Sequence, residues 1–190
     1  MKKRLTATLF ALIATAIALF ALTAYAAPMP EVQCKYRLIP VPGGICITEY
    51  HQYLVNRTIN LEIAAQTLDG TVVTPGGIFS FNDIIGRATE EKGYRPAKIF
   101  IDGREEEGLG GGICQLSSAL YNAAAWAGLE IIERHPHSRD VDYVPKGRDA
   151  ATAYGGVDFR FRNSTTLPIF ITALMQNGVL IVALDYVVAY

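Results

Sequence analysis

A helical pattern of apolar residues begins at a cysteine near the middle of the chain. Leu116, Leu120 and Ala124 recur at i, i+4 and i+8, and Gly128 closes the pattern. Three consecutive glycines stand just before it, and Cys114 is the first residue that fits the helix. The spacing therefore predicts a central helix with a thiol at or near its N-terminus.

Upstream of this helix, the pattern predicts a second helix and several short strands. Residues 60–68 have a helical spacing of apolar positions and are followed by Asp69-Gly70. Strands are expected at 71–73, 78–81 and 97–101. A Pro75-Gly76 turn separates the first two strands, and Asp102-Gly103 after the third is a hairpin signal. The acidic run at 105–107 is expected to be a solvated strand edge or a loop.

Downstream, period-two alternation replaces the helical spacing. Strands are expected at 129–134 and around 157–161, where Val157, Phe159 and Phe161 share one face. Two further apolar runs, 168–174 and 179–187, flank Asn177-Gly178, which predicts a final hairpin. Together these elements predict an α+β domain in which a mainly antiparallel sheet packs on the helix that starts at the glycine and cysteine motif.

The first residues have the pattern of a secretory signal peptide. A positive start, an apolar stretch at 9–22 and the small residues of Ala24-Tyr25-Ala26 predict a signal peptide over residues 1–26. An uncleaved anchor is the alternative, because the apolar stretch approaches the length of a membrane span. We also expect a transient membrane contact through this N-terminal segment. We therefore expect an exported protein of the cell envelope, in the periplasm or cell wall, or a secreted one.

The sequence predicts one domain, at 55–190, preceded by an extension at 27–54. Removing residues 1–26 takes away three cations, so the net charge falls from −1 to −4. This acidic balance argues against nucleic acid as a partner. In the extension, Cys34 and Cys46 flank a turn-rich segment that a disulfide between them could close. That pairing would leave Cys114 as the single unpaired thiol of an exported protein.

The residues around and after Cys114 suggest thiol acyl transfer. A helix start lowers the pKa of a thiol, and acyl transfer needs a nucleophile, an imidazole base and a group that orients the imidazole. His137 is the preferred base, with His135 second, and Asp149 is the favoured orienting acid. The remaining acids on these segments are Asp140, Asp142 and Asp158. The alternative for Cys114 is a buried structural thiol.

Further candidates lie beside the cysteine. Gly110, Gly111 and Gly112 would let a substrate backbone approach, with nearby N–H groups forming an oxyanion hole. Gln115 is expected either to donate to the oxyanion or to cap the helix, and Ser117 and Tyr121 are candidate substrate-binding residues. Cys114 with both histidines would suit zinc, but no second local cysteine or carboxylate motif completes such a site. We therefore expect neither a metal nor another cofactor.

These motifs together resemble the VanW family. The matching stretches are 60–70, 75–82, 110–115, 120–123, 128–130, 133–135, 137–138, 143–147, 149–150 and 158–163. The resemblance implies a cell-envelope protein and L,D-transpeptidation of peptidoglycan. In that reaction Cys114 would attack a tetrapeptide stem, release the terminal D-amino acid and pass the acyl group to the amine of a neighbouring stem, with His137 shuttling the proton. A non-catalytic module that binds peptidoglycan or glycopeptide is the alternative.

Overall fold

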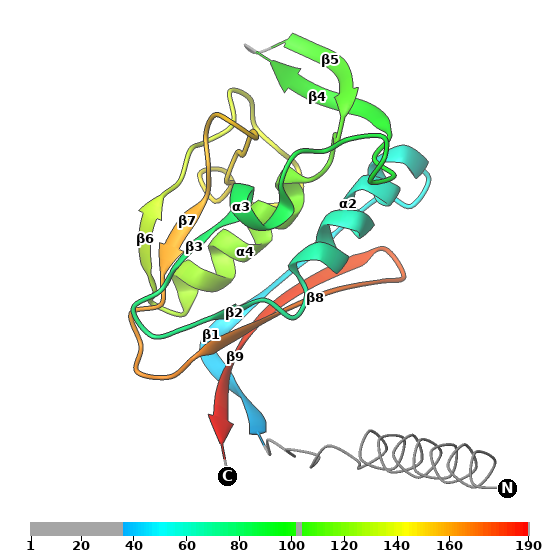
Figure 1. Cartoon of the computed structure of the whole chain (residues 1–190). Coiled ribbons are helices and arrows are strands. Elements are labelled where there is room, and N and C mark those ends of the chain that lie inside the picture. Colours follow the sequence, from blue (N-terminus) through cyan, green and yellow to red (C-terminus); the bar gives the residue numbers. More distant parts are fainter. Residues whose placement is uncertain (1–35, 102–103, 190) are drawn as a thin grey trace, which may run out of the picture. The chain divides into compact units, whose positions relative to one another are not determined.

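The computed structural model describes residues 36–101 and 104–189, and Figure 1 shows how their helices and strands are arranged. The predicted signal peptide at 1–26, Cys34 and the Asp102-Gly103 turn lie outside the described residues. In chain order the elements are β1 (Tyr36–Glu49), α2 (Val55–Leu68), β2 (Val72–Val73), β3 (Ile78–Ser80), α3 (Phe81–Ile85), β4 (Pro96–Ile101), β5 (Arg104–Leu109), α4 (Cys114–Trp126), β6 (Glu130–Glu133), β7 (Arg160–Arg162), β8 (Ile169–Gln176) and β9 (Val179–Ala189).

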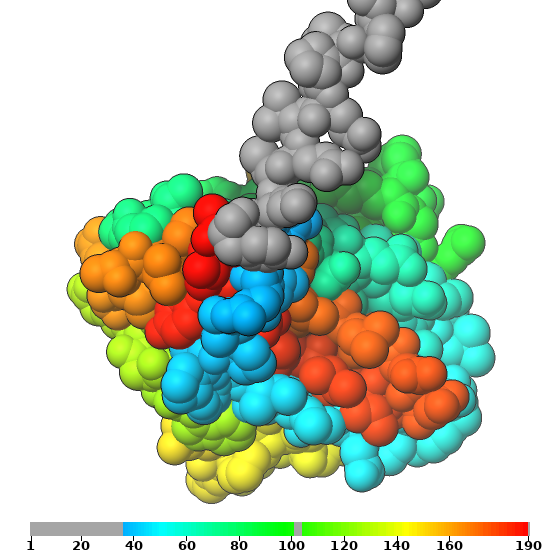
Figure 2. Space-filling model, turned by 90° about the horizontal axis from the view of Figure 1, so that it is seen from below, coloured from blue at the N-terminus to red at the C-terminus, as the bar shows by residue number. Residues whose placement is uncertain are grey.

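The largest sheet has four strands in the order β1-β9-β8-β2, and all its pairs are antiparallel. Its long strands alternate between buried and more exposed positions, because one face carries the core. Figure 2 shows β1, β8 and β9 side by side on the opposite face. The predicted hairpin at Asn177-Gly178 is confirmed, with Gln176 paired to Val179.

The helices cover the inner face of this sheet. The core side chains of α4, among them Leu116, Leu120 and Ala124, are fully buried, as is Leu61 of α2. The remaining strands form a three-stranded sheet, β3-β7-β6, and the antiparallel hairpin β4-β5. In Figure 1 this hairpin projects away from the other elements. The structure thus confirms the predicted α+β fold and its central helix.

The segment that we expected to be a turn-rich loop is the edge strand β1. Tyr36 lies opposite Ala189 and Cys46 opposite Val182, with an irregularity between Pro40 and Ile45. An edge strand tolerates prolines and a bulge, so those turn signals were misleading. Residues 36–49, which we assigned to an extension before residue 55, therefore belong to the largest sheet. The extended path of β1 does not favour a closed loop, but the Cys34–Cys46 pairing stays a prediction because Cys34 is not described.

Three smaller expectations change. The helix predicted at 60–68 begins earlier, at Val55. Residue 81, expected to end a strand, instead starts α3, because the side chain of Ser80 accepts a hydrogen bond from the N–H of Asp83 and caps this helix. The strand expected at 157–161 is reduced to β7. Asp158 turns its carboxylate onto the backbone N–H groups of Asn82 and Phe159 instead of pairing in a sheet.

Within residues 36–101 and 104–189, no helix has the length and apolar character needed to span a membrane.

Candidate active site

The glycine run forms a tight turn that delivers Cys114 to the start of α4. Gly110 and Gly112 have positive φ values of 81° and 109°, which side-chain-bearing residues rarely adopt. Gly111 passes against β4, and a Cβ on it would stand 2.5 Å from the carbonyl oxygen of Lys98. All three glycines are therefore required by backbone geometry and close packing.

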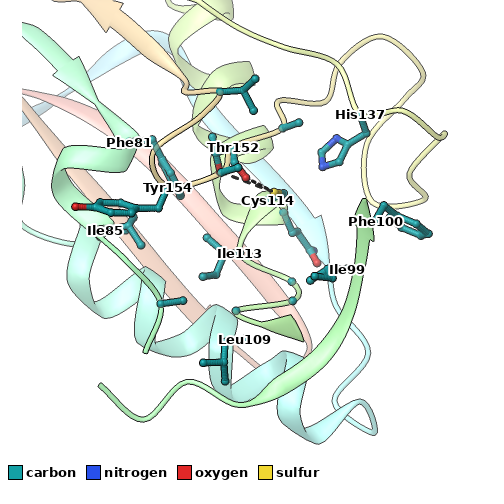
Figure 3. Close-up of a pocket in the computed structure, with 18 of the residues that line it drawn as sticks. Phe81, Ile85, Ile99, Phe100, Leu109, Ile113, Cys114, His137, Thr152 and Tyr154 are labelled. Atoms are coloured by element: carbon teal, nitrogen blue, oxygen red, sulfur yellow. Dashed lines mark hydrogen bonds between the residues drawn. The ribbon is translucent and has the colours of Figure 1, made fainter. Parts of the chain in front are cut away.

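Cys114 is partly buried in a cleft that it shares with His137 (Figure 3). Its sulfur lies 3.5 Å from the carbonyl oxygen of Thr152 and 3.8 Å from the hydroxyl of the same residue. Burial raises the pKa of the thiol, but the hydrogen bond and charge of His137, together with Thr152, more than offset this effect. The net pKa of Cys114 is therefore lowered, which favours the nucleophilic thiolate.

His137 is fixed from behind by Asp149. One carboxylate oxygen of Asp149 accepts hydrogen bonds from the backbone N–H of His137 at 2.6 Å and from its Nδ1 at 2.7 Å. The other oxygen accepts from the guanidinium of Arg134 at 2.9 Å. Since Asp149 engages Nδ1, the other ring nitrogen, Nε2, is left available for proton transfer.

The three groups tune one another electrostatically. Burial lowers the pKa of His137, yet its hydrogen bonds and charge interactions with Cys114 and Asp149 raise the pKa overall. Burial likewise raises the pKa of Asp149, and its hydrogen bonds from His137 lower it more, so the net pKa is below the usual range. These directions favour a thiolate beside an imidazolium, oriented by an ionised carboxylate.

The structure separates the favoured base and acid from the other candidates. His135 is two residues away but pairs through its ring with Glu133 at 3.0 Å, and its side chain is 42% exposed outside the cleft. Asp158 accepts a hydrogen bond from the hydroxyl of Ser80 at 2.6 Å and has no hydrogen bond to either imidazole. Asp140 forms a surface ion pair with Lys146. Of the candidates, only His137 and Asp149 bond to each other.

The side chain of Gln115 connects elements of the fold and does not have the predicted role of donating to an oxyanion or capping the helix. Its amide nitrogen donates to the hydroxyl of Thr48 and the carbonyl of Glu49, at 3.0 and 2.8 Å. Its amide oxygen accepts from Arg57 at 2.9 Å. Both N–H groups are thus used in tying α4 to β1, so Gln115 neither caps the helix nor offers a donor to an oxyanion.

Ser117 and Tyr121, predicted to bind substrate, do not line the cleft. Ser117 is fully buried, and its hydroxyl donates to the carbonyl of Ala150 at 2.6 Å. Tyr121 packs edge-on against Phe159 and lies beneath the guanidinium of Arg134. Both residues lie on faces of α4 that pack into the protein, so they position the helix.

Three backbone N–H groups at this turn have no acceptor. Within the described residues, the amides of Gly111, Gly112 and Cys114 donate to no backbone or side-chain oxygen, whereas the amide of Ile113 bonds to Gly110. Backbone amides of this kind can stabilise a developing oxyanion. The glycine turn therefore brings unpaired N–H groups to the cleft of Cys114, whereas both N–H groups of Gln115 are already used.

The cleft around Cys114 has a volume of about 470 Å³. Phe81, Ile85, Leu109 and Tyr154 form apolar parts of its wall. Tyr143 also lines it, and burial together with the charge of Cys114 raises the pKa of this phenol well above its usual range. Tyr143 and Tyr154 were among the tyrosines considered as groove residues, whereas Tyr94 is buried away from the cleft.

Two contributors were not anticipated from the sequence. Thr152 contacts the sulfur of Cys114. The guanidinium of Arg134 donates hydrogen bonds to the carboxylate and to the backbone carbonyl of Asp149. Both lie in or beside an irregular segment whose path no periodicity predicts. The only sequence signal was that Arg134 adjoins the histidine pair.

Among the described residues, no group of three or more His, Cys, Asp or Glu side chains is arranged to hold a metal ion.

Comparison with known proteins identifies the family. Residues 56–184 match the family model described as "VanW like protein". The chain is 45% identical over 141 residues to "Uncharacterized protein YoaR" of Bacillus subtilis (strain 168), an alignment covering 74% of this chain and 46% of the relative. It is 33% identical over 128 residues to "Vancomycin B-type resistance protein VanW" of Enterococcus faecalis (strain ATCC 700802 / V583), covering 63% of this chain and 46% of the relative.

The chain thus spans less than half the length of these relatives, and no solved structure matches it. The family match covers the whole segment that holds Cys114, His137 and Asp149. The resemblance first noted from the sequence motifs is confirmed: this chain belongs to the VanW-like family.

Proposed function

We propose that this protein is a cysteine-dependent acyltransferase of the cell envelope that acts on peptidoglycan stem peptides. The observation that carries the proposal is that His137, bonded to Asp149, shares one cleft with Cys114, and that the pKa directions of all three groups favour an activated thiolate. A buried structural thiol would need neither a polarised imidazole nor an open cleft. The family resemblance supplies the substrate class.

The arrangement suits a two-step reaction. The thiolate of Cys114 attacks the carbonyl carbon of an amide, and the N–H groups of Gly112 and Cys114 receive the developing oxyanion. The C–N bond breaks, and protonated His137 gives its proton to the departing amine. A thioester remains on Cys114. An amine or water then attacks it, His137 takes the proton from this nucleophile, and the sulfur leaves as thiolate.

A role at the cell envelope is supported by the relatives. One of them carries a name that links it to vancomycin resistance, and the predicted signal peptide would deliver the domain outside the cytoplasm. Outside the cell, acyl transfer has to draw on a bond already present in its substrate. Exchange of one amide for another meets that requirement, since no nucleotide is consumed.

Intact-protein mass spectrometry tests the proposal directly. The domain and its Cys114→Ala variant are incubated with a disaccharide-tetrapeptide and, separately, with a carbapenem as acylating agent. The expected result is a mass increase that maps to Cys114 and is missing in the variant. Unmodified protein with both reagents, combined with normal binding of the tetrapeptide by Cys114→Ala, would overturn the proposal in favour of a non-catalytic binding module.

A further inference from the structure

A second groove adjoins the cleft of Cys114. Its volume is about 850 Å³, and Arg57, Lys98, Phe100 and Tyr143 line both spaces. The guanidinium of Arg57 lies 5.6 Å from the ring centre of Tyr143, so these two side chains form part of the shared wall. Cys114 lines the first space together with these two side chains, which places the wall beside the nucleophile.

The cleft that contains Cys114 is cationic. Its described lining includes Arg57, Arg87 and Lys98 but no aspartate or glutamate. Arg57 is held by Gln115, and Lys98 pairs with Glu105 across the β4-β5 hairpin. Arg87 is exposed and makes no ion pair or hydrogen bond within the described residues, so its guanidinium is free to bind a carboxylate.

The adjoining groove has the opposite character. Its lining adds four carboxylates, from Glu49, Glu107, Asp140 and Asp142, of which Asp140 pairs with the exposed Lys146 outside the lining; the only lysine and arginine of the lining belong to the shared wall. Tyr53 is 75% exposed at its edge, and an aromatic face of this kind attracts a cation. Positive charge on a ligand would therefore favour its binding in this groove.

We propose that the two spaces are separate subsites, an acyl-donor site at Cys114 that holds the donor's free carboxylate through Arg87 and an acceptor site in the acidic groove for a substrate bearing a protonated amine. This inference rests on the proposed acyl transfer and deepens it, because it assigns the direction of the reaction. The donor stem peptide is an anion, and the acceptor side chain is a primary ammonium group.

The acceptor step balances without any further reactant. The bound ammonium releases one proton to solvent, and its neutral amine attacks the thioester on Cys114. The new C–N bond forms as the C–S bond breaks, His137 takes the second proton from nitrogen, and the thiolate is restored. Holding the amine beside the thioester raises its effective concentration, which favours transfer over hydrolysis.

The acceptor site is tested by the ratio of aminolysis to hydrolysis of the acyl-enzyme. A disaccharide-tetrapeptide serves as donor, Nα-acetyl-lysine amide as cationic acceptor and hydroxylamine as an acceptor that is neutral at pH 7. The double variant Asp140→Asn/Asp142→Asn is expected to lower the ratio about fivefold or more for the lysine amide and less than about twofold for hydroxylamine. High salt should remove this difference. Equal effects on both acceptors would overturn the acceptor site.

The donor site is tested with a matched pair of donors. Arg87→Glu should slow acyl-enzyme formation about fivefold or more with the free C-terminal carboxylate, but not with the same tetrapeptide as its amide. Arg37→Glu, on exposed β1, is the matched control for added negative charge. Equal slowing with both donors would overturn the role of Arg87.

Binding to Cys114→Ala separates this inference from the proposed chemistry. Amide chemical shifts near Asp142 should move with lysine amide even when the tetrapeptide is bound. Displacement of one ligand by the other would overturn the two-subsite arrangement. If both bind together but the wild-type protein never forms an acyl-enzyme, the proposed catalysis fails and the two subsites stand.

Discussion

Replacing Asp149 with asparagine should damage both stability and reactivity, because the same carboxylate holds two partners. Asp149 is 7% exposed, and its two oxygens accept from His137 twice and from Arg134 once. An asparagine keeps one acceptor oxygen and turns an NH2 group toward N–H donors. Losing the charged partner of such a set costs about 2–4 kcal/mol. For a domain of this size, that corresponds to a melting temperature lower by roughly 4–16 °C.

The effect on chemistry should exceed what the loss of stability explains. The charge and hydrogen bonds of Asp149 help to raise the pKa of His137, so the variant lowers that pKa and depletes the imidazolium beside the thiol. Acylation should fall about 100-fold or more, the usual contribution of positioned proton transfer. The assay is the rate of acyl-enzyme formation at Cys114, measured by mass spectrometry well below the unfolding transition.

Asp158→Asn is the matched control for this experiment. Asp158 is 8% exposed and also accepts three hydrogen bonds, from Ser80, Asn82 and Phe159, but it does not touch the imidazole. It should lower the melting temperature comparably and leave acylation of the folded protein close to normal. The reasoning is refuted if folded Asp149→Asn acylates at the wild-type rate, or if Asp158→Asn loses as much activity.

The remaining predictions concern the base, the pH dependence and the glycine turn. His137→Ala should abolish rapid alkylation of Cys114 by iodoacetamide near neutral pH, because the thiol loses the largest effects that offset its burial and keeps only those of Thr152, whereas His135→Ala should alkylate normally; equal rates in both variants would contradict the assignment. Acyl transfer should follow a bell-shaped pH profile in stopped assays. The rate of acyl transfer should rise as Cys114 ionises, at a pKa below the usual value for a thiol. It should fall as His137 loses its proton, at a pKa above the usual value for an imidazole, and a monotonic profile would argue against the ion pair. The raised pKa of His137 should likewise stabilise the fold at low pH, a contribution lost as the pH rises through that pKa, which denaturant titrations would detect. Gly111→Ala should cost about 1–3 kcal/mol in thermal unfolding, because its Cβ would meet the backbone of Lys98 at 2.5 Å; an unchanged melting temperature would contradict the close packing.

The parts of the fold that follow from local pattern were predictable. The helix at Cys114 and the hairpin at Asn177-Gly178 have clear periodicity and turn chemistry, and both occur as expected. The strand β1 was not predictable in this way. Its prolines and glycines resemble a turn, while its pairing with β9, near the other end of the chain, leaves no local signal. Gly43 is needed there because a Cβ would stand 2.5 Å from the carbonyl oxygen of Trp126.

In the candidate site too, residue types could be predicted from the sequence, but the direction of a side chain could not. Cys114, His137 and Asp149 could be proposed from residue chemistry and order along the chain, and the structure brings these three together. Gln115 and Ser117 were misassigned because α4 is buried on almost every side, so their polar groups bond to neighbouring segments even though Gln115 borders the cleft. Their position beside the cysteine in sequence carried no information about that direction.

The nucleophile Cys114 is held more firmly than its base His137, which makes the hydrogen bonds of Asp149 decisive for the position of the imidazole. Cys114 sits on a helix tied down by Gln115 and by buried hydroxyls. His137 lies on a segment with almost no regular structure, joined to the fold by an isolated bridge between His135 and Ala151. The geometry of the pair therefore depends on the bonds that Asp149 makes. The three side chains can lose their alignment while the domain stays folded. Conditions that weaken the hydrogen bonds of Asp149 should therefore lower the reactivity of the Cys114 thiol before the domain unfolds.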